Sequence, residues 1–238
     1  MKIAVCSLSI GDEFRQITRN GIKSKKLYCE KHGYTFIDDE SVYDNTRPHA
    51  WSKILLVKKY LQEYDYIMWI DGDTFIMNDE ITIEERLQKL NPEDKDLLLA
   101  NDHVCANTGV FFIKNTEFSM QLLDEIYKQT YFVNNPLFGD YEQNAYIKLY
   151  DDNWNNIQTH VKTIRYPYQI EFNSYWCNYY YGHFILHFAG CRNKNDLRLC
   201  MEKFCPIKKD EESDESFKSR IKWLIEDSRK EADRMIGR

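Results

Sequence analysis

The sequence lacks long apolar runs, closely paired cysteines, internal repeats and any excess of positive charge. No stretch of about 18 apolar residues occurs, so we expect no membrane span. Acidic and basic residues are interspersed and the formal net charge is -6, which argues against a nucleic-acid partner. None of the seven cysteines belongs to a C-x-x-C pair, so a zinc site is not expected. An anionic substrate would therefore need a local metal ion and a few well-placed cations.

Size and composition fit an ordinary globular protein. The 238 residues suit one α/β domain, and the 43% hydrophobic and 29% charged content permits a normal core. The apolar residues 1–10 run into Gly11 without a small-residue cleavage pattern, so we interpret them as a first β-strand and not as a signal peptide. We expect a soluble protein with the cytoplasm as its compartment.

The cysteines should be mostly reduced, with a Cys191–Cys200 or Cys200–Cys205 bridge as the alternative in an oxidising compartment.

Apolar periodicity predicts strands and helices that alternate along the first third of the chain. The predicted order is a strand over 2–8, a helix over 12–32, a strand over 34–37, a helix over 49–64 and a strand over 65–70. Gly33 marks the end of the first helix. This order is typical of an α/β fold with a mostly parallel central sheet flanked by helices. In such sheets ligands bind beyond the carboxyl ends of the strands, so the residues that follow the predicted strands are candidate site residues.

The rest of the chain predicts further α/β elements and a distinct tail. We expect helices over 80–90, 117–131 and 141–150, strands over 97–100, 110–113 and 184–188, and an irregular aromatic stretch over 151–183. Residues 1–205 form the main domain in this prediction. Residues 206–238 form a charged segment and a C-terminal helix, packed on the domain or at a homodimer contact.

Asp71-Gly72-Asp73 is the most informative motif. It follows the apolar run 65–70 and therefore lies at a strand end. Two carboxylates two residues apart on an extended chain point to the same side, and Gly72 would let a bulky anion approach the backbone. Such oxygen ligands suit a divalent cation that also binds phosphate oxygens. Asp-Gly between apolar runs is equally a hairpin-turn signal, so both interpretations stay open at this point.

Four other segments carry residues suited to a polar site. They are Trp51-Ser52-Lys53-Ile54, Asn107-Thr108-Gly109, Asp140-Tyr141-Glu142-Gln143-Asn144 and His187-Phe188-Ala189-Gly190-Cys191-Arg192. Together with the acidic motif, their order from about Ile3 to Arg192 resembles glycosyltransferase family 34, which includes yeast galactosyl- and mannosyltransferases and plant xyloglucan xylosyltransferases. The resemblance implies a GT-A fold over residues 1–205. It also implies a manganese-dependent, retaining transfer of a hexose or pentose from a nucleotide-diphosphate sugar.

The resemblance further implies a metal site. Asp71 and Asp73 match the family's acidic pair, which binds metal and donor, and His187 matches the histidine that completes the metal shell. Two carboxylates, an imidazole and phosphate oxygens suit Mn²⁺, with Mg²⁺ as the alternative. Arg192 matches a cation near the donor diphosphate, whose oxygens a guanidinium can grip. Taken alone, His187 would be interpreted as a core histidine and Arg192 as a surface charge.

A catalytic pair follows from the same resemblance. Glu142 and Gln143 match the family's acid–glutamine pair near the reacting sugar carbon. The carboxylate could form a covalent adduct, or the acceptor could attack from the face of the departing phosphate. The sequence leaves both mechanisms open. Glu142 could also simply favour a helix N-terminus.

Further donor contacts are expected from small residues at strand ends and from one lysine. The predicted donor-binding residues are Ser7, Lys53, Asp71, Asp73, Asn107, Thr108, Gly109, Gly190 and Arg192. An exposed helix lysine is the plainer interpretation of Lys53, and a turn before a strand is that of residues 107–109. Asp102 and His103 follow a strand end and could meet donor or acceptor. The aromatic residues 175–181 are the candidate acceptor platform, since sugars stack on aromatic faces.

The expected partners are a nucleotide-sugar donor, with UDP as the first candidate nucleotide, and a glycan or glycoprotein acceptor. The alternative is a non-catalytic carbohydrate-binding protein with a glycosyltransferase-like fold, against which the intact acidic pair argues. A nucleotidyltransferase ranks last, because residues 7–11 contain one glycine and no lysine. Many family members carry a Golgi membrane anchor, which this sequence does not show. Golgi association is therefore the alternative to a cytoplasmic location.

Overall fold

A six-stranded sheet forms the centre of the molecule in the computed structural model, which describes residues 1–133, 135, 141–180, 182–208 and 211–226. The strand order is β2-β1-β3-β6-β5-β7. The strands are β1 (Ile3–Cys6), β2 (Thr35–Ile37), β3 (Tyr66–Ile70), β5 (Leu97–Asn101), β6 (Ala106–Lys114) and β7 (Val161–Ile164). Three pairings are parallel, and the two that involve β6 are antiparallel. The predicted α/β fold with a mostly parallel sheet is confirmed.

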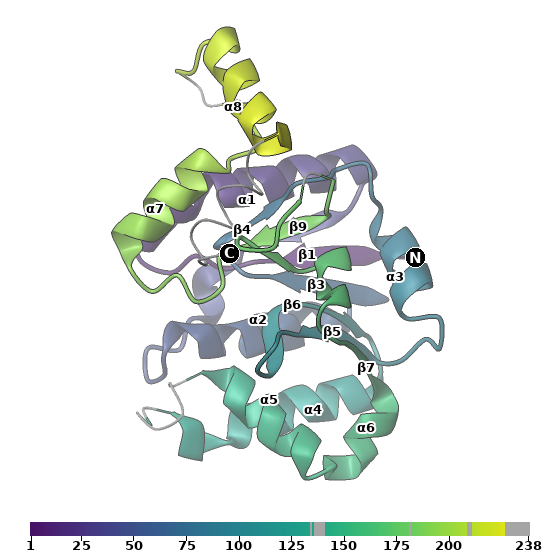
Figure 1. Cartoon of the computed structure of the whole chain (residues 1–238). Helices are drawn as coiled ribbons and strands as arrows, with labels where there is room; N and C mark the ends of the chain where they lie inside the picture. The colour runs from purple at the N-terminus through teal and green to yellow at the C-terminus, as the bar shows by residue number, and fades with distance from the viewer. Residues whose placement is uncertain (134, 136–140, 181, 209–210, 227–238) are drawn as a thin grey trace.

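Helices cover both faces of this sheet (Figure 1), with α1 and α7 on one face and α2, α4 and α5 on the other. The helices are α1 (Asp12–His32), α2 (Ser52–Leu61), α3 (Ile83–Leu90), α4 (Glu117–Lys128), α5 (Glu142–Asp151), α6 (Ile157–His160), α7 (Lys194–Lys203) and α8 (Asp214–Glu226). Short 3₁₀ helices span Glu40–Val42, His49–Trp51, Thr130–Phe132, Trp154–Asn156 and Tyr168–Glu171. No helix within the described ranges is long and apolar enough to cross a membrane.

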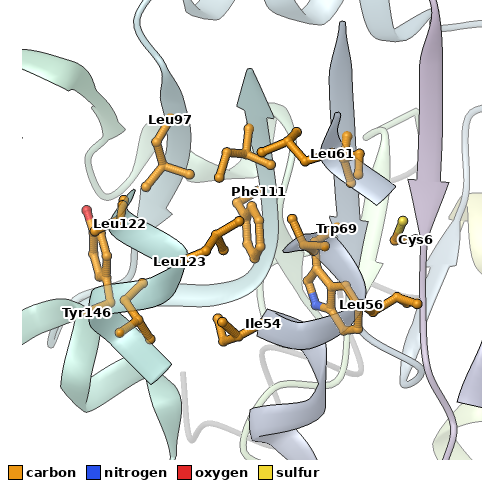
Figure 2. Packing of buried hydrophobic residues seen from close by; sticks show 14 of the residues in the cluster. Cys6, Ile54, Leu56, Leu61, Trp69, Leu97, Phe111, Leu122, Leu123 and Tyr146 are labelled. Atoms are coloured by element: carbon orange, nitrogen blue, oxygen red, sulfur yellow. The ribbon is translucent and has the colours of Figure 1, made fainter. Parts of the chain in front are cut away.

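The largest core cluster lies between the sheet and α2, α4 and α5. Figure 2 shows Ile54 of α2, Leu123 of α4 and Tyr146 of α5 around Trp69 and Phe111 of the sheet. All five side chains are buried. This packing holds α2 and α5 against the sheet. Their first turns carry the predicted site residues Lys53, Glu142 and Gln143.

A smaller, three-stranded sheet stands beside the central one. Its order is β4-β9-β8, formed by β4 (Thr74–Ile76), β9 (Ile185–His187) and β8 (Ser174–Tyr175). Thr74 of β4 lies opposite His187 of β9 in an antiparallel ladder. Because β3 and β4 belong to different sheets, the acidic motif between them is not a hairpin turn. The hairpin interpretation of residues 71–73 is therefore wrong: the chain crosses there from one sheet to the other.

Caps set the boundaries of the helices, and the sequence predicted some of these boundaries correctly. The first helix runs over Asp12–His32 as predicted, because Gly33 adopts φ 74° and ends it. The helix expected from residue 80 begins only at Ile83, after Thr82 closes a capping box. The expectation of an irregular stretch over 151–183 is wrong in part, since β7, β8 and α6 lie within it.

The C-terminal helix α8 lies outermost, beyond α1 and α7 (Figure 1). Its Leu224 is buried in a cluster with Phe204, and its Trp223 ring meets Phe204 edge-on at 5.2 Å. The helix therefore contacts the end of the main domain. The division at residue 205 and the homodimer contact stay predictions.

The cysteines 6, 29, 105, 177, 191, 200 and 205 are all free thiols.

Candidate functional site

The acidic turn is held in place by both sheets. The Asp71 amide donates to the carbonyl of Gly109 in β6 at 2.8 Å, and the Trp69 indole donates to Asp71 Oδ1 at 2.7 Å. The carbonyl of Asp73 accepts from the Phe188 amide, just after β9, at 3.1 Å. Both carboxylates are partly exposed, Asp71 by 29% and Asp73 by 20%. A ligand from solvent can therefore reach them.

His187 completes a compact group of metal-binding side chains with the acidic pair. Its Nε2 lies 3.6 Å from Asp73 Oδ1 and 4.0 Å from Asp71 Oδ2. One ligand atom from each of the three residues lies within 4.8 Å of the other two. Two carboxylates and an imidazole form a donor set that fits Mn²⁺. The structure thus brings together the three residues that the sequence resemblance selected.

A chain of amide side chains fixes the tautomer of His187. The Gly109 backbone N–H donates to Asn107 Oδ1 at 3.1 Å, and Asn173 Nδ2 donates to the same oxygen at 3.0 Å. Asn173 Oδ1 must then face His187 Nδ1, 3.1 Å away. Because an amide oxygen only accepts, Nδ1 carries the proton and Nε2 keeps a lone pair for a metal ion. Asn173 is fully buried, and the sequence analysis did not select it.

Gly109 is small because the ligands crowd against it. A Cβ on this residue would overlap the His187 ring and lie 2.9 Å from Asp71 Oδ2. Any larger residue would push the imidazole or the carboxylate out of place. The predicted contact of Gly109 with the donor stays a prediction, and the structure shows that Gly109 makes room for Asp71 and His187.

Gly72 serves packing rather than ligand approach, contrary to the expectation. It is buried, and a Cβ there would lie 2.7 Å from Ser9 Oγ and 3.1 Å from the carbonyl of Leu8. The missing side chain lets the acidic turn pack against the loop after β1. A bulky anion cannot approach the backbone on that side.

Burial shifts the protonation of the Asp73 carboxyl group. It is the main cause that raises the pKa of Asp73 above its usual range. The nearby His187 opposes this shift, whereas the Asp71 carboxylate adds to it. Two neighbouring carboxylates at the edge of a buried region favour the binding of a cation that compensates their charge.

Lys53 is buried and paired, and it is not an exposed helix lysine. Its Nζ lies 2.8 Å from Glu142 Oε1 and 3.1 Å from Asp71 Oδ1, and it donates to the Thr108 carbonyl at 3.1 Å. Burial alone would lower the pKa of Lys53, but the carboxylates of Asp71 and Glu142 outweigh it, so the pKa lies above its usual range. The ammonium therefore stays charged and links α2, α5 and the acidic turn.

The first turn of α5 places Glu142 and Gln143 against Thr108. Glu142 Oε1 accepts from the Thr108 hydroxyl at 2.7 Å, and Gln143 Oε1 accepts from the Thr108 amide at 3.1 Å. The Glu142 side chain is only 2% exposed, and its Oε2 has no hydrogen-bond partner among the described residues. Both predicted catalytic residues thus contact Thr108, and Lys53 links Glu142 to Asp71.

The other three predicted donor-binding residues follow the ends of β1 and β9. Ser7 is fully buried, and its hydroxyl has no hydrogen-bond partner in the described part of the chain. Gly190 is exposed at φ 78°, a conformation that favours glycine, in the turn after β9. Arg192 is exposed two residues later. This turn begins at Phe188, whose amide bonds the Asp73 carbonyl.

The aromatic stretch does not form the expected acceptor platform as a whole. Tyr175 and Tyr179 are buried, at 9% and 2% exposure, and Tyr181 lies outside the described residues. The Tyr175 ring meets His187 edge-on at 5.8 Å, and its hydroxyl donates to Asp102 Oδ2 at 3.3 Å. Tyr175 therefore supports His187, a candidate metal ligand, and its buried ring cannot stack on a sugar.

Comparison with known proteins identifies the family. The galactosyl transferase GMA12/MNN10 family matches residues 5–92 and 84–198, which together cover most of the chain. The chain belongs to glycosyltransferase family 34. The resemblance drawn from the five sequence segments is thereby confirmed.

Relatives in this family share modest identity with the chain. It is 23% identical over 245 residues to an uncharacterized alpha-1,2-galactosyltransferase of Schizosaccharomyces pombe, which covers 87% of this chain and 65% of that protein. It is 28% identical over 127 residues to a probable xyloglucan 6-xylosyltransferase of Arabidopsis thaliana, covering 50% of this chain and 27% of that protein. The chain thus spans less than two thirds of the length of either relative.

Solved structures show the same fold at low identity. A glycosyltransferase involved in the glycosylation of the major capsid of PBCV-1 aligns with a TM-score of 0.69 and 18% identity, over 85% of this chain and 99% of that one. The apo-form glycosyltransferase GlyE of Streptococcus pneumoniae aligns with a TM-score of 0.53 and 12% identity, over 100% of this chain and 63% of that one. The predicted GT-A fold is confirmed.

Proposed function

We propose that this protein is a metal-dependent, retaining glycosyltransferase. It moves a hexose or pentose from a nucleoside-diphosphate sugar to a glycan or glycoprotein. One observation carries the proposal: a member of glycosyltransferase family 34 brings Asp71, Asp73 and His187 together where its two sheets meet. A UDP-sugar is the first candidate donor, because the relatives include galactosyl- and xylosyltransferases.

Donor binding would begin at this ligand group. Asp71, Asp73 and His187 Nε2 would hold Mn²⁺, which as a Lewis acid stabilises the negative charge of the leaving diphosphate. Trp69 orients the Asp71 carboxylate. Arg192, exposed in the turn after β9, would donate a fork of hydrogen bonds to the diphosphate oxygens.

The donor sugar would lie over the start of β6 and the first turn of α5. Thr108 donates hydrogen bonds to both Glu142 and Gln143, so the three residues form one hydrogen-bonded group. Gln143 is partly exposed and Glu142 is buried. Gln143 would therefore face the reacting sugar carbon, while Glu142 would stabilise positive charge there from behind Thr108.

A donor panel tests the proposal. The protein is incubated with Mn²⁺ and each of several nucleotide sugars, and release of the nucleoside diphosphate is measured. Hydrolysis or transfer with one donor class is expected. Asp73→Ala should reduce it by about 1,000-fold, because several kcal/mol of charge stabilisation are lost. Calorimetry that shows glycan binding without metal-dependent nucleotide binding or turnover would contradict the proposal and favour a carbohydrate-binding protein.

A further inference from the structure

One face of α1 packs against the backbone of the acidic turn. Gly21 and Lys25, one helical turn apart, both contact the carbonyl side of residues 71–74. This face carries none of the residues that would touch metal, donor or sugar. Its contacts nonetheless end on the main-chain carbonyls of Asp71, Gly72 and Thr74, which flank the proposed metal ligand Asp73.

Lys25 is fully buried, and among the described residues it donates to main-chain oxygens only. Its Nζ lies 2.8 Å from the Asp71 carbonyl and 3.2 Å from the Gly72 carbonyl. The Thr74 hydroxyl donates to the Asp71 carbonyl as well, at 2.7 Å. An amine donates in both of its protonation states, so this clamp does not require the charged form.

Gly21 brings the helix close enough for that clamp. A Cβ on Gly21 would lie 2.6 Å from the Thr74 carbonyl and 2.8 Å from the Gly72 carbonyl. A helix with alanine here would have to move away from the turn. Glycine inside a helix is unfavourable by itself, which is consistent with a packing requirement at this position.

We infer that Gly21 and Lys25 are positioning residues that set the geometry of the Asp71–Asp73 metal site through its backbone. Peptide groups are planar, so directing the carbonyls of Asp71 and Gly72 toward one amine fixes the two peptide planes that flank Gly72. Those planes decide where both carboxylates project. Gly72 itself is conformationally free, which makes an external clamp necessary. The inference rests on the proposed metal-dependent function and deepens it.

Manganese titration of the purified protein tests this inference without any donor. Calorimetry with Mn²⁺ alone would compare the wild type with Lys25→Met, Gly21→Ala and the control Lys26→Met. Lys26 neighbours Lys25 on α1 but is half exposed and paired with Asp38 at 3.2 Å. Thermal melting of each metal-free variant reports whether it is folded.

The Kd for Mn²⁺ should rise about 10- to 100-fold in Lys25→Met and Gly21→Ala, the range seen when an outer-shell partner is lost, and stay unchanged in Lys26→Met. Excess Mn²⁺ should restore transfer by Lys25→Met, because all three ligands remain. If Lys25→Met does not fold, Gly21→Ala decides, since alanine favours the helix itself.

Folded variants that bind Mn²⁺ as tightly as the wild type would overturn the positioning role alone. A wild type that binds no Mn²⁺ would overturn both this role and the metal-dependent function.

Discussion

Two buried lysines reach the same acidic turn from helices on opposite faces of the sheet (Figure 1). Lys53 of α2 pairs with the carboxylates of Asp71 and Glu142. Lys25 of α1 donates only to the main-chain carbonyls of Asp71 and Gly72. Lys53 therefore compensates charge by direct ion pairs, whereas Lys25 holds the backbone and acts on the carboxylates only through space.

The difference separates what each lysine can do for a metal site. Lys53 shares Asp71 Oδ1 with the Trp69 indole, so it leaves Oδ2 of that carboxylate toward His187. Lys25 leaves every carboxylate oxygen free. Removing Lys53 should disturb the electrostatics of the whole network, whereas removing Lys25 should loosen the turn without breaking a direct ion pair.

The largest effect on the ligand group is expected from Gly109→Ala. The new methyl group would overlap the His187 ring and crowd Asp71, displacing two ligands at once. The Kd for Mn²⁺, measured by calorimetry, should rise by more than about 100-fold, beyond the effect of losing an outer-shell partner. A folded Gly109→Ala protein with unchanged affinity for Mn²⁺ would show that His187, in the position next to Gly109, does not bind the metal ion.

Lys53→Met should produce the largest loss of stability, because it leaves the buried Glu142 carboxylate and the partly exposed Asp71 carboxylate without their cation. The free energy of unfolding of the metal-free protein should fall by about 3–5 kcal/mol. Urea denaturation at neutral pH measures it, with Lys58→Met on the same helix as the control. Equal stability of the two variants would refute the role of Lys53 in charge compensation. Lys25→Met should reduce the free energy of unfolding less than Lys53→Met does. A larger reduction in Lys25→Met would contradict the assignment of direct charge compensation to Lys53.

Asn173→Ala should weaken metal binding by about 10- to 100-fold. The change removes the acceptor that holds the Nδ1 proton of His187. Asn173→Asp keeps an acceptor there and should weaken Mn²⁺ binding less than alanine does. Should aspartate prove as harmful as alanine, the tautomer would not depend on this hydrogen bond.

Glu142→Gln should have the smallest effect of the four, a decrease in kcat of about tenfold. The amide keeps the shape of the side chain and one acceptor for Thr108, but loses the ion pair with Lys53. Steady-state kinetics with the active donor measures it. A loss beyond about 1,000-fold, together with a sugar adduct on Glu142 of the wild type in the mass spectrum, would instead indicate that Glu142 is a covalent nucleophile.

The first half of the fold could be predicted because its signals are local. The α1 helix ends where Gly33 takes a left-handed conformation, and β1 and β3 are short apolar runs between helices. The strands β4, β7 and β8 have two to four residues and no alternating pattern of their own. They exist because distant partners pair with them, as β9 does with β4.

The candidate site likewise contains residues that could be predicted from the sequence and residues that could not. Asp71, Asp73 and His187 could be selected because carboxylates and imidazole carry an obvious metal chemistry, and the structure brings them together. Asn173 and Lys25 could not, since a lone asparagine in an aromatic stretch and a lysine on an amphipathic helix look like ordinary surface residues. Their roles arise only from tertiary contacts with Asn107, His187 and the acidic turn.

A crystal of the protein soaked with UDP and Mn²⁺, with diffraction recorded near the manganese absorption edge, tests the central claim most directly. The account predicts one strong anomalous peak bound by Asp71, Asp73 and His187 Nε2, with diphosphate oxygens completing its shell. Manganese bound elsewhere, or UDP bound without metal at these three residues, would contradict it.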